Sequence, residues 1–515
     1  MSRKIVGFLL IITLLISSGA SFAASEVPTG MIRVGLKYGV VTNDTETITS
    51  DTGFEIAFKN GDTVTQIYDL GGEKELKAIK DDTYHIQIGS AYADLATMLG
   101  VLDTYDKIDN SAFPVFDNGW KIYYGSYASK AKAEAKLSAV KNTYNASVVV
   151  AGLNAKHVQV SGSENVEFVY ESGASDFFFR PKAGSGVAVV RYNGKGYRGG
   201  IGFKRYSDSV LTVINYITMD DYLYGVLPKE MSGDWPIEAL KAQAVAARSY
   251  TMVSFGKHSD HGFDICNTTD CQVYGGFDVE KPGSNQAVDE TTGKLLKYNG
   301  QIVQTYYHST SGGQTESIQN IWSGTLPYIV GVYDPYSEGS PNSEWELSYT
   351  NKEIENILSQ KGHYIGSLKD VRIDEVSENG RVQKLVFVGT QGTAEFIKEK
   401  ARALFGYRTL KSMWFELGNK PMVTVVSRSS YSRADLSGSK YITSNGLEVG
   451  QGTSYVVTDG QSTSKLSFST GKVVFRGRGY GHGLGMSQWG AKAMAEQGFS
   501  YDQILTHYYT NTEIE

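Results

Sequence analysis

The pattern of hydrophobic and polar positions predicts many short strands in the first part of the chain. Residues 31–36 alternate as expected of a strand with one buried face, and glycine-rich turns separate similar segments up to about residue 110. A strand at residues 120–127 precedes a segment rich in alanine and lysine, and residues 148–150 return as a strand. The apolar residues of the middle segment fall on one face of a helix: Ala133, Leu137, Val140 and Tyr144. This pattern predicts a β-α-β unit.

Helical patterns follow from residue 218. Thr218 and the aspartates after it predict a capped helix start, and Pro228 predicts the end of that helix. A second helix opens at residues 234–236, where Asp234 is expected to be the N-cap. Its predicted inner face consists of Ile237, Leu240, Ala244, Ala247 and Thr251. Later elements, predicted from the same signals, are a helix at 352–360 capped by Thr350, strands at 371–374 and 384–388, a helix at 394–405, and a short helix from Ser500 through Tyr508.

Composition and charge narrow the class of protein. The 515 residues are 41% hydrophobic and 20% charged, which is ordinary globular usage and predicts several domains. There are 57 glycines and 34 tyrosines but only 10 prolines, which favours strands and tight turns with aromatic rings available for flat ligands such as sugars. The 49 basic and 55 acidic residues give a net charge of −6, which argues against a nucleic-acid binder.

The start of the chain has the features of an export signal. Arg3 and Lys4 precede an apolar run at residues 5–16, and a small-residue stretch ends at Ala23. We expect residues 1–23 to be a signal peptide cleaved after Ala23, although an uncleaved membrane anchor is the alternative. The run is shorter than the roughly 20 residues of a membrane span. The mature protein is therefore expected to be exported, to be extracellular or associated with the cell wall, and to have no membrane span.

Four ordered motifs identify a family. The runs lie at residues 221–250, 271–276, 308–316 and 479–491; the first includes Pro228-Lys229-Glu230-Met231, and the last begins Gly479-Tyr480-Gly481-His482-Gly483. Together they resemble the SpoIID/LytB domain of the stage II sporulation protein D family. The resemblance covers residues 185–515 and, weakly, the opening strand at 32–36.

The resemblance implies a peptidoglycan lytic transglycosylase with Glu230 as its acid/base. A lone carboxyl suits this reaction, because the C6 hydroxyl of the sugar can replace the water that a second carboxylate would otherwise activate. Glu230 would first protonate the leaving oxygen and then accept a proton, giving a 1,6-anhydromuramyl end. This role needs a raised pKa, which apolar neighbours such as Leu227, Met231 and Trp235 would favour.

The same motifs supply polar and aromatic side chains that we expect to bind the glycan. They are Lys241, Gln243, Arg248, Tyr250, His308, Ser309, Ser311, His482, Ser487 and Gln488. Buried polar groups that stabilise turns are the plain structural alternative for the residues of the two later segments. A serine hydrolase is a poor interpretation, because the G-x-S-x-G nucleophile elbow is missing.

Two cysteines and two histidines lie close together in the sequence. Cys266 and Cys271 with an upstream imidazole suit a tetrahedral zinc site. We expect His261 to be the third ligand, with His258 as its substitute or as a fourth ligand. A disulfide or free thiols remain open alternatives for the cysteine pair.

The predicted β-α-β unit resembles the sporulation-related repeat (SPOR), whose family binds peptidoglycan glycan strands. We therefore predict an α+β protein with a signal peptide at 1–23, a strand-rich region at 31–112, a SPOR-like module at 117–160, and a β-rich catalytic domain with packed helices at 185–515. The alternatives are a non-catalytic glycan-binding enhancer of a cell-wall amidase, which would be a partner of this protein, and a zinc hydrolase.

Overall fold

The computed structural model describes residues 30–39, 45–108, 111–163, 165–173, 175–205, 211–418 and 471–515, and the backbone of six strands between residues 422 and 467. The predicted signal segment at 1–23 lies outside the described residues. The fold is mixed α+β and rich in strands, as predicted. Over the described ranges, none of the helices combines the length and hydropathy needed to cross a membrane.

A seven-stranded sheet joins the opening strand to strands at residues 176–266. Strand β1 (Ile32–Lys37) pairs antiparallel with β16 (Leu211–Ile217) and parallel with the short β17 (Ile265–Cys266). The sheet continues from β16 through β15 (Gly200–Arg205), β12 (Asp176–Pro181), β3 (Phe54–Asn60) and β4 (Thr63–Asp69). The opening strand is therefore part of the unit that carries the C-terminal motifs.

A ten-stranded sheet holds the module predicted to resemble SPOR. Its order is β14-β13-β2-β5-β10-β11-β7-β8-β6-β9. The strands are β2 (Thr45–Thr49), β5 (Glu75–Lys80), β6 (Tyr84–Tyr92), β7 (Ala112–Phe116), β8 (Trp120–Tyr127), β9 (Val148–Ala151), β10 (His157–Ser161), β11 (Val166–Glu171), β13 (Val190–Tyr192) and β14 (Lys195–Tyr197).

Four of these strands form a β-α-β-β-α-β unit with three helices. The chain runs β6, α1 (Leu95–Asp106), β7, β8, α2 (Lys130–Glu134), α3 (Leu137–Tyr144) and β9, and the strand order β7-β8-β6-β9 is that of a split β-α-β fold. The predicted helix face at residues 133–144 is divided between α2 and α3. The unit extends from Tyr84 to Ala151, so the sequence predicted only its second half.

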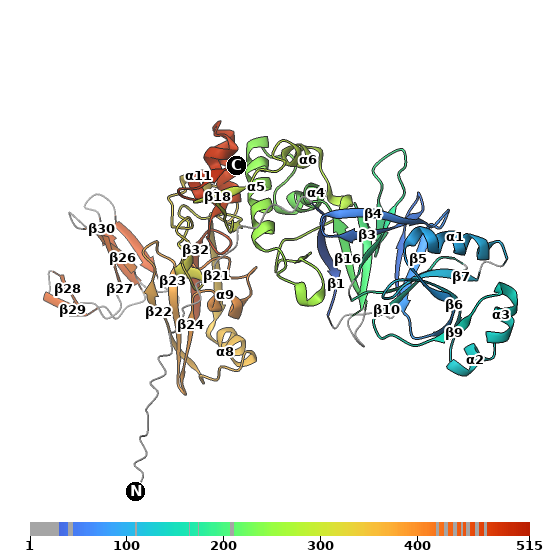
Figure 1. The fold of residues 1–515 in the computed structure, drawn as a ribbon. Helices are drawn as coiled ribbons and strands as arrows, with labels where there is room; N and C mark the ends of the chain where they lie inside the picture. The colour runs from blue at the N-terminus through green and yellow to red at the C-terminus, as the bar shows by residue number, and fades with distance from the viewer. Residues whose placement is uncertain are drawn as a thin grey trace, which may run out of the picture.

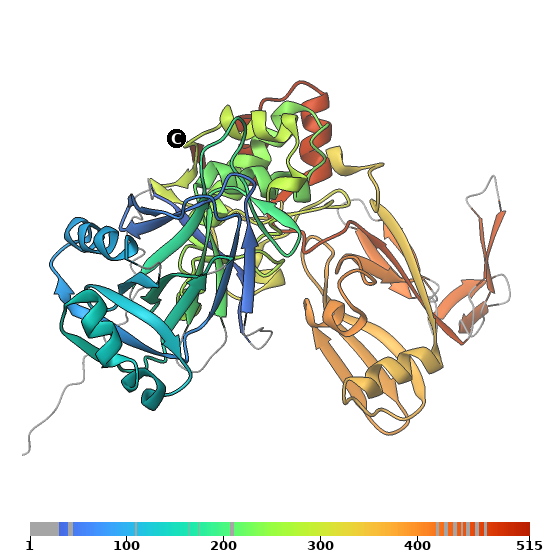
Figure 2. The ribbon, with the colours of Figure 1, turned by 90° about the vertical axis from the view of Figure 1, so that its right-hand side faces the viewer.

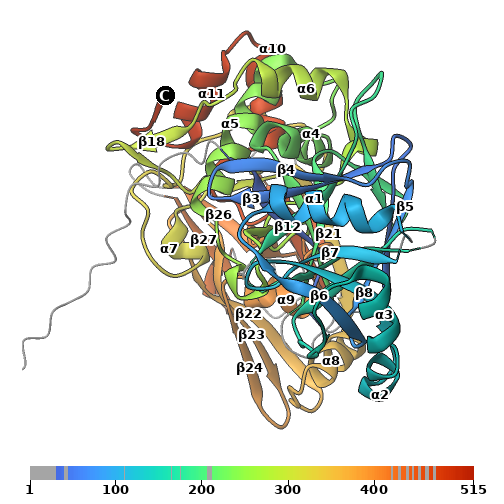
Figure 3. The ribbon, with the colours of Figure 1, turned by 45° about the vertical axis from the view of Figure 1, so that its right-hand side comes forward.

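The helices around the first motif form a layer against the seven-stranded sheet. They are α4 (Met219–Glu230), α5 (Ile237–Val253), α6 (Pro282–Asp289), α10 (Gln488–Glu496) and α11 (Tyr501–Tyr508). In Figures 1, 2 and 3 the red helices α10 and α11 lie beside the green helix α5, although they are far apart from it in the sequence. A three-stranded sheet contacts α5 and consists of β18 (Leu296–Tyr298), β19 (Gln301–Ile302) and β34 (Glu513–Ile514).

Two expectations about helix ends were wrong. Helix α4 continues past Pro228 for two residues, and the Met231 N–H donates to the carbonyl of Leu227. The missing N–H of proline therefore costs one bond near the helix end without stopping the last turn. Asp234 does not cap α5, because Pro236 occupies the N-cap position and no side chain bonds there.

The segment before the last motif forms a lobe with its own core. Strands β21 (Glu344–Thr350), β32 (Lys472–Arg478) and β25 (Phe415–Leu417) make one sheet, and β22 (Leu368–Val376), β23 (Val382–Gly389) and β24 (Thr393–Ile397) make another. Helices α8 (Asn351–Gln360) and α9 (Lys400–Phe405) complete the lobe, and Figure 1 shows it at the end opposite to the split β-α-β unit. Three hairpins between β25 and β32 are β26 (Met422–Val426) with β27 (Tyr431–Asp435), β28 (Lys440–Thr443) with β29 (Gly446–Val449), and β30 (Ser454–Thr458) with β31 (Thr463–Ser467).

The predicted helix at 394–405 is half wrong. Its first part is strand β24, where Ala394 and Phe396 are buried and Glu395 between them is exposed. This alternation has the period of a strand, and pairing with the central strand β23 outweighs the helix preference of the charged residues that follow.

Candidate functional site

Glu230 is the last residue of α4, and its carboxyl meets the start of α10. The amide Nε2 of Gln488, the first residue of α10, donates to Glu230 Oε2 at 3.2 Å. Burial raises the pKa of Glu230 to about 6, against the opposing effects of the Gln488 hydrogen bond and the charge of Lys229. The site therefore holds a half-buried carboxyl that carries its proton in a large fraction of molecules near pH 6.

Two distant motifs pair with each other directly before Gln488. The short strands β20 (Tyr307–His308) and β33 (Met486–Ser487) pair in parallel, with His308 opposite Ser487. The backbone N–H of Trp489 donates to the carbonyl of half-buried Ser309 at 3.0 Å. These bonds fix the N-terminus of α10 and with it Gln488.

The two motif histidines lie together, with ring centroids 5.5 Å apart. Burial, followed by the charge of His482, lowers the pKa of His308 well below its usual value. Burial also lowers the pKa of His482 to about 3, with smaller effects from Arg402 and Arg381. Both rings are therefore neutral near pH 7. Nδ1 of His482 accepts from the Leu484 N–H at 2.9 Å, which places the ring proton on Nε2.

Ser311 and Ser487 belong to a buried hydrogen-bond network around Asp334. Ser311 Oγ donates to Asp334 Oδ2 at 2.6 Å, and the Tyr508 hydroxyl donates to Oδ1 at 2.9 Å. Ser487 Oγ accepts from the N–H groups of Ser311 and Gly490 and caps α10. Asp334 lies outside all four motifs and was not predicted as a site residue. Both serines are 0% exposed, so these contacts make them part of the scaffold of the site.

The predicted binding residues on α5 have mixed surroundings. Lys241 pairs with Glu238 at 2.9 Å and with Glu290 at 2.6 Å. Arg248 is buried, pairs with Asp220 at 2.9 Å and donates to the carbonyls of Thr291, Lys294 and Val288. These partners occupy the charged groups of both side chains.

Gln243 and Tyr250 differ from these two cations. Gln243 is 0% exposed, and over the described ranges its amide has no hydrogen-bond partner. Tyr250 is half-buried, with its ring 6.3 Å from that of Tyr306. Trp235, which was predicted only as an apolar neighbour, packs on Trp489 with ring centroids 4.8 Å apart. The structure thus brings an aromatic pair to the residue that follows Gln488.

A cluster of possible metal ligands lies where β17 meets β1. The ligand atoms of His258, Cys266, Asp270 and Cys271 all lie within 4.8 Å of one another, and both cysteines are free thiols. A hydrogen bond from Cys271 lowers the pKa of Cys266 to about 4, whereas the same contact raises that of Cys271. The cluster is therefore prepared to carry a thiolate, the form that binds metals.

The expected ligand His261 is not part of this cluster. It ends the 3₁₀ turn Ser259–His261, and its ring packs 5.5 Å from Tyr38 and 6.1 Å from Phe263. His258 precedes the turn and places Nε2 3.4 Å from Cys271 Sγ and 3.3 Å from Asp270 Oδ2. Tetrahedral zinc would separate an imidazole nitrogen from a thiolate by about 3.6 Å and from a carboxylate oxygen by about 3.4 Å. These spacings fit zinc, with His258 in place of His261 and Asp270 as an additional ligand.

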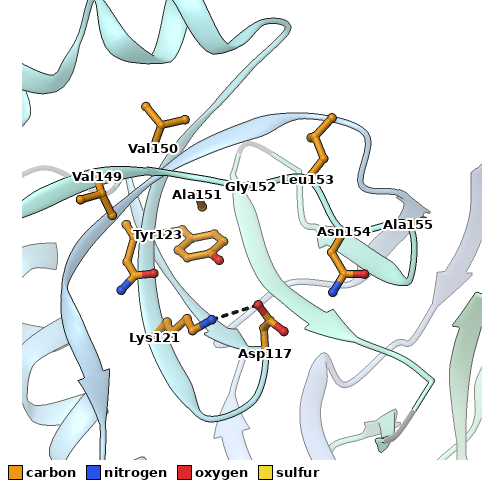
Figure 4. Close-up of a pocket in the computed structure, with 11 residues that line it drawn as sticks. Asp117, Lys121, Tyr123, Val149, Val150, Ala151, Gly152, Leu153, Asn154 and Ala155 are labelled. Carbon is orange, nitrogen blue, oxygen red and sulfur yellow. Dashed lines mark hydrogen bonds and ion pairs between the residues drawn. The ribbon is translucent and has the colours of Figure 1, made fainter.

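A pocket lies on the open face of the split β-α-β unit. It has a volume of about 510 Å³, and its polar side chains are Gln87, Asp117, Lys121, Tyr123 and Asn154. Figure 4 shows Lys121 and Asp117 joined across its floor, with the Tyr123 ring and the Asn154 amide turned toward the space. The ion pair measures 2.9 Å. The pocket thus offers both donors and acceptors on the face away from helices α1 to α3.

Comparisons with known proteins agree on one family. A family model described as stage II sporulation protein matches residues 207–298. The chain is 31% identical over 385 residues to the amidase enhancer of Bacillus subtilis, which covers 69% of this chain and 49% of that relative. It is 30% identical over 323 residues to an uncharacterized protein of Brachyspira hyodysenteriae, covering 62% of this chain and 73% of the relative.

Stage II sporulation protein D of Bacillus subtilis is 27% identical over 316 residues, with 58% of this chain and 75% of the relative covered. The chain spans about half the length of the amidase enhancer and about three quarters of the other two relatives. The motifs, their assembly around Glu230 and these matches show that the chain belongs to the stage II sporulation protein D (SpoIID) family.

Proposed function

We propose that this protein is an exported lytic transglycosylase that cleaves peptidoglycan glycan strands during cell-wall remodelling in sporulation. The observation that carries the proposal is the Glu230 carboxyl, whose pKa is raised to about 6 and which is held by Gln488. A carboxyl of this kind can protonate the oxygen between N-acetylmuramic acid and N-acetylglucosamine and then take up a proton from the C6 hydroxyl of the muramyl ring. The C6 oxygen then closes onto C1, which gives the 1,6-anhydromuramyl end and leaves Glu230 protonated again.

Mass spectrometry of the released fragments tests this proposal. Wild type and Glu230→Gln are incubated with peptidoglycan whose stem peptides an amidase has removed. Anhydromuramyl ends from wild type alone support the proposal, and Glu378→Gln, which changes an exposed carboxyl, serves as the matched control. Hydrated ends would identify a hydrolase instead.

A non-catalytic role as an enhancer of a cell-wall amidase is the second candidate. It is favoured by the printed name of the Bacillus subtilis relative, amidase enhancer, whose match covers 69% of this chain. In this case neither wild type nor Glu230→Gln releases fragments. Both accelerate peptide release by a purified amidase to the same extent.

We also propose that His258, Cys266, Asp270 and Cys271 hold a structural zinc ion. Four protein donors fill a tetrahedral site, which leaves no position for the water of a zinc hydrolase. The ion would tie the loop after α5 to the sheet at β1 and β17. Metal analysis of purified protein is expected to give one zinc per chain for wild type and for the control His261→Ala, and none for Cys271→Ser. Retention of zinc by His258→Ala with loss in His261→Ala would contradict this ligand set.

We further propose that the split β-α-β unit is the SPOR-like module and binds glycan at the pocket of Figure 4. Sugar hydroxyls and acetamido groups need both donors and acceptors, and Asp117, Lys121 and Asn154 provide them on one surface. Lys121→Ala is expected to weaken co-sedimentation with denuded glycan by about tenfold, the effect of losing one hydrogen bond to a charged group. The control Lys141→Ala changes an exposed lysine of α3. Equal binding by both variants would contradict the assignment.

A further inference from the structure

Asp334 is a buried carboxyl that the proposed mechanism leaves without a role. It is 0% exposed and directly precedes the 3₁₀ turn Pro335–Ser337. The Ser311 hydroxyl donates to Oδ2 at 2.6 Å, and the Tyr508 hydroxyl donates to Oδ1 at 2.9 Å. Burial lowers the pKa of His507, the residue before Tyr508, so this imidazole is neutral near pH 7. Within the described ranges the carboxyl thus has hydroxyl donors but no ion pair with a lysine or arginine.

The first turn of α10 lies directly against this carboxyl. A Cβ atom added to Gly490, the third residue of α10, would lie 2.7 Å from Oδ1 and 2.8 Å from Oδ2 of Asp334. Ser487, the N-cap residue, accepts from the N–H groups of Gly490 at 3.2 Å and Ser311 at 3.3 Å. The N-terminus of a helix carries a partial positive charge and stabilises an anion placed against it. This position explains how the fold can bury a carboxylate that has no cation paired with it.

The same turn of α10 holds the partner of the catalytic carboxyl. Gln488 follows Ser487 and is 8% exposed, and its Nε2 donates to Glu230 Oε2 at 3.2 Å. The direction of this amide depends on the placement of the first turn, because Gln488 is part of that turn. Asp334 is therefore linked to Glu230 through Ser311, Ser487 and the backbone of α10.

We propose that Asp334 is a positioning residue, which fixes the N-terminus of α10 so that the Gln488 amide stays bonded to the Glu230 carboxyl. The inference deepens the proposed transglycosylase function and rests on it for any effect on the rate. Loss of the charge at Asp334 removes the attraction for the helix N-terminus and an acceptor for two hydroxyl groups. The first turn would then shift, and the charged form of Glu230 would lose the hydrogen bond that stabilises it.

The pKa of Glu230 is the readout, because a merely structural role of Asp334 would not change it. Urea unfolding between about pH 4 and pH 9 is measured for wild type, Glu230→Gln, Asp334→Asn and the double variant. The effect of Glu230→Gln in each background isolates the titration of Glu230, since the titration of Asp334 cancels. This effect should stop changing near pH 6 in the wild-type background and about one pH unit higher with Asp334→Asn. The pH at which the rate of anhydromuramyl release falls should increase by the same amount.

Two further variants control for the loss of packing. Asp176→Asn removes the charge of a half-buried carboxyl in β12 that pairs with Lys204 at 2.6 Å. It is expected to unfold at a lower temperature, while the pKa of Glu230 stays near 6. Tyr508→Phe removes one donor to Asp334 and keeps the ring, so it should raise the pKa of Glu230 by less than Asp334→Asn does. This variant also tests the inference if Asp334→Asn does not fold.

Gln488→Leu separates this route from other effects of Asp334. Because both changes act on the same hydrogen bond, Asp334→Asn combined with Gln488→Leu should raise the pKa of Glu230 no further than Gln488→Leu alone. An unchanged pKa of Glu230 in Asp334→Asn and Tyr508→Phe, or additive shifts in the combined variant, overturns the inference. The unfolding measurement does not depend on catalysis, so absence of anhydromuramyl ends from the wild type overturns the proposed function and not this positioning role.

Discussion

Replacement of Glu230 by glutamine should stabilise the protein at neutral pH. The pKa of this carboxyl rises from 4.5 to about 6 on folding, and 1.5 pH units at 1.36 kcal/mol each correspond to about 2 kcal/mol. Because the side chain is partly exposed, solvent screening reduces this value, and we expect about 1 to 2 kcal/mol. The folded state prefers the protonated acid. The free energy of unfolding therefore falls as pH rises from about 4.5 through 6 and stays lower above that range.

Glutamine cannot ionise, so the free energy of unfolding of the variant does not fall in this way as pH rises. Urea unfolding of wild type and Glu230→Gln at pH 4 and at pH 7.5 measures the effect, and the difference between the two proteins should grow in favour of the variant by about 1 to 2 kcal/mol at the higher pH. Glu378→Gln, which changes an exposed carboxyl, should show the same difference from wild type at both pH values. An equal difference for Glu230→Gln at pH 4 and pH 7.5 would refute the assignment of a raised pKa.

Of three further predictions, two concern the site and one concerns the lobe that contains α8. Gln488→Leu removes a hydrogen bond that favours the charged form of Glu230, so the pKa of Glu230 should rise. Such bonds contribute about 1.5 to 3 kcal/mol, so the pH at which the rate falls should increase by about one unit in a pH–rate profile. An unshifted profile would contradict the contact. Gly485→Ala should give no folded protein by circular dichroism, because φ is +62° and the new Cβ would lie 2.1 Å from the Tyr306 carbonyl oxygen; a soluble, folded variant would contradict this. Thr350→Ala removes the capping box of α8 and should lower the free energy of unfolding of the lobe, measured by urea unfolding, by about 1 kcal/mol. An unchanged free energy of unfolding would contradict the cap.

Local sequence patterns predicted the helices and strands more reliably than the distant segments with which they pair. The alternation at residues 31–36 predicted β1, but its pairing with β16 and β17 depends on residues that lie about 180 and 230 positions later. The helix caps at Thr218, Thr350 and Ser500 were predicted and are confirmed, because a cap depends on residues within one turn. Such short-range rules do not reveal which distant strand or helix an element packs against.

In the site, too, the sequence predicted residues more reliably than their contacts. Glu230 was identified from its motif, but its contact with Gln488 spans 258 positions and follows from packing. His261 was preferred to His258 because it is nearer to Cys266 in sequence, whereas the 3₁₀ turn leaves His258 and not His261 with the other ligand atoms. Spacing along the chain cannot specify that rotation. Asp334 lies in a loop without a motif and could not be found from the sequence.

The position of β1 determines how the protein can be divided for study. A fragment that begins at residue 185 contains all four motifs but lacks β1, so β16 and β17 would lose the strand between them. The unpaired backbone edge would favour association between copies of the fragment. Tyr38, which hydrogen-bonds Cys266, would be lost as well. Such a fragment also lacks β12, the partner of β15, so residues 30–39 supplied as a separate peptide would cover only one of its two exposed sheet edges.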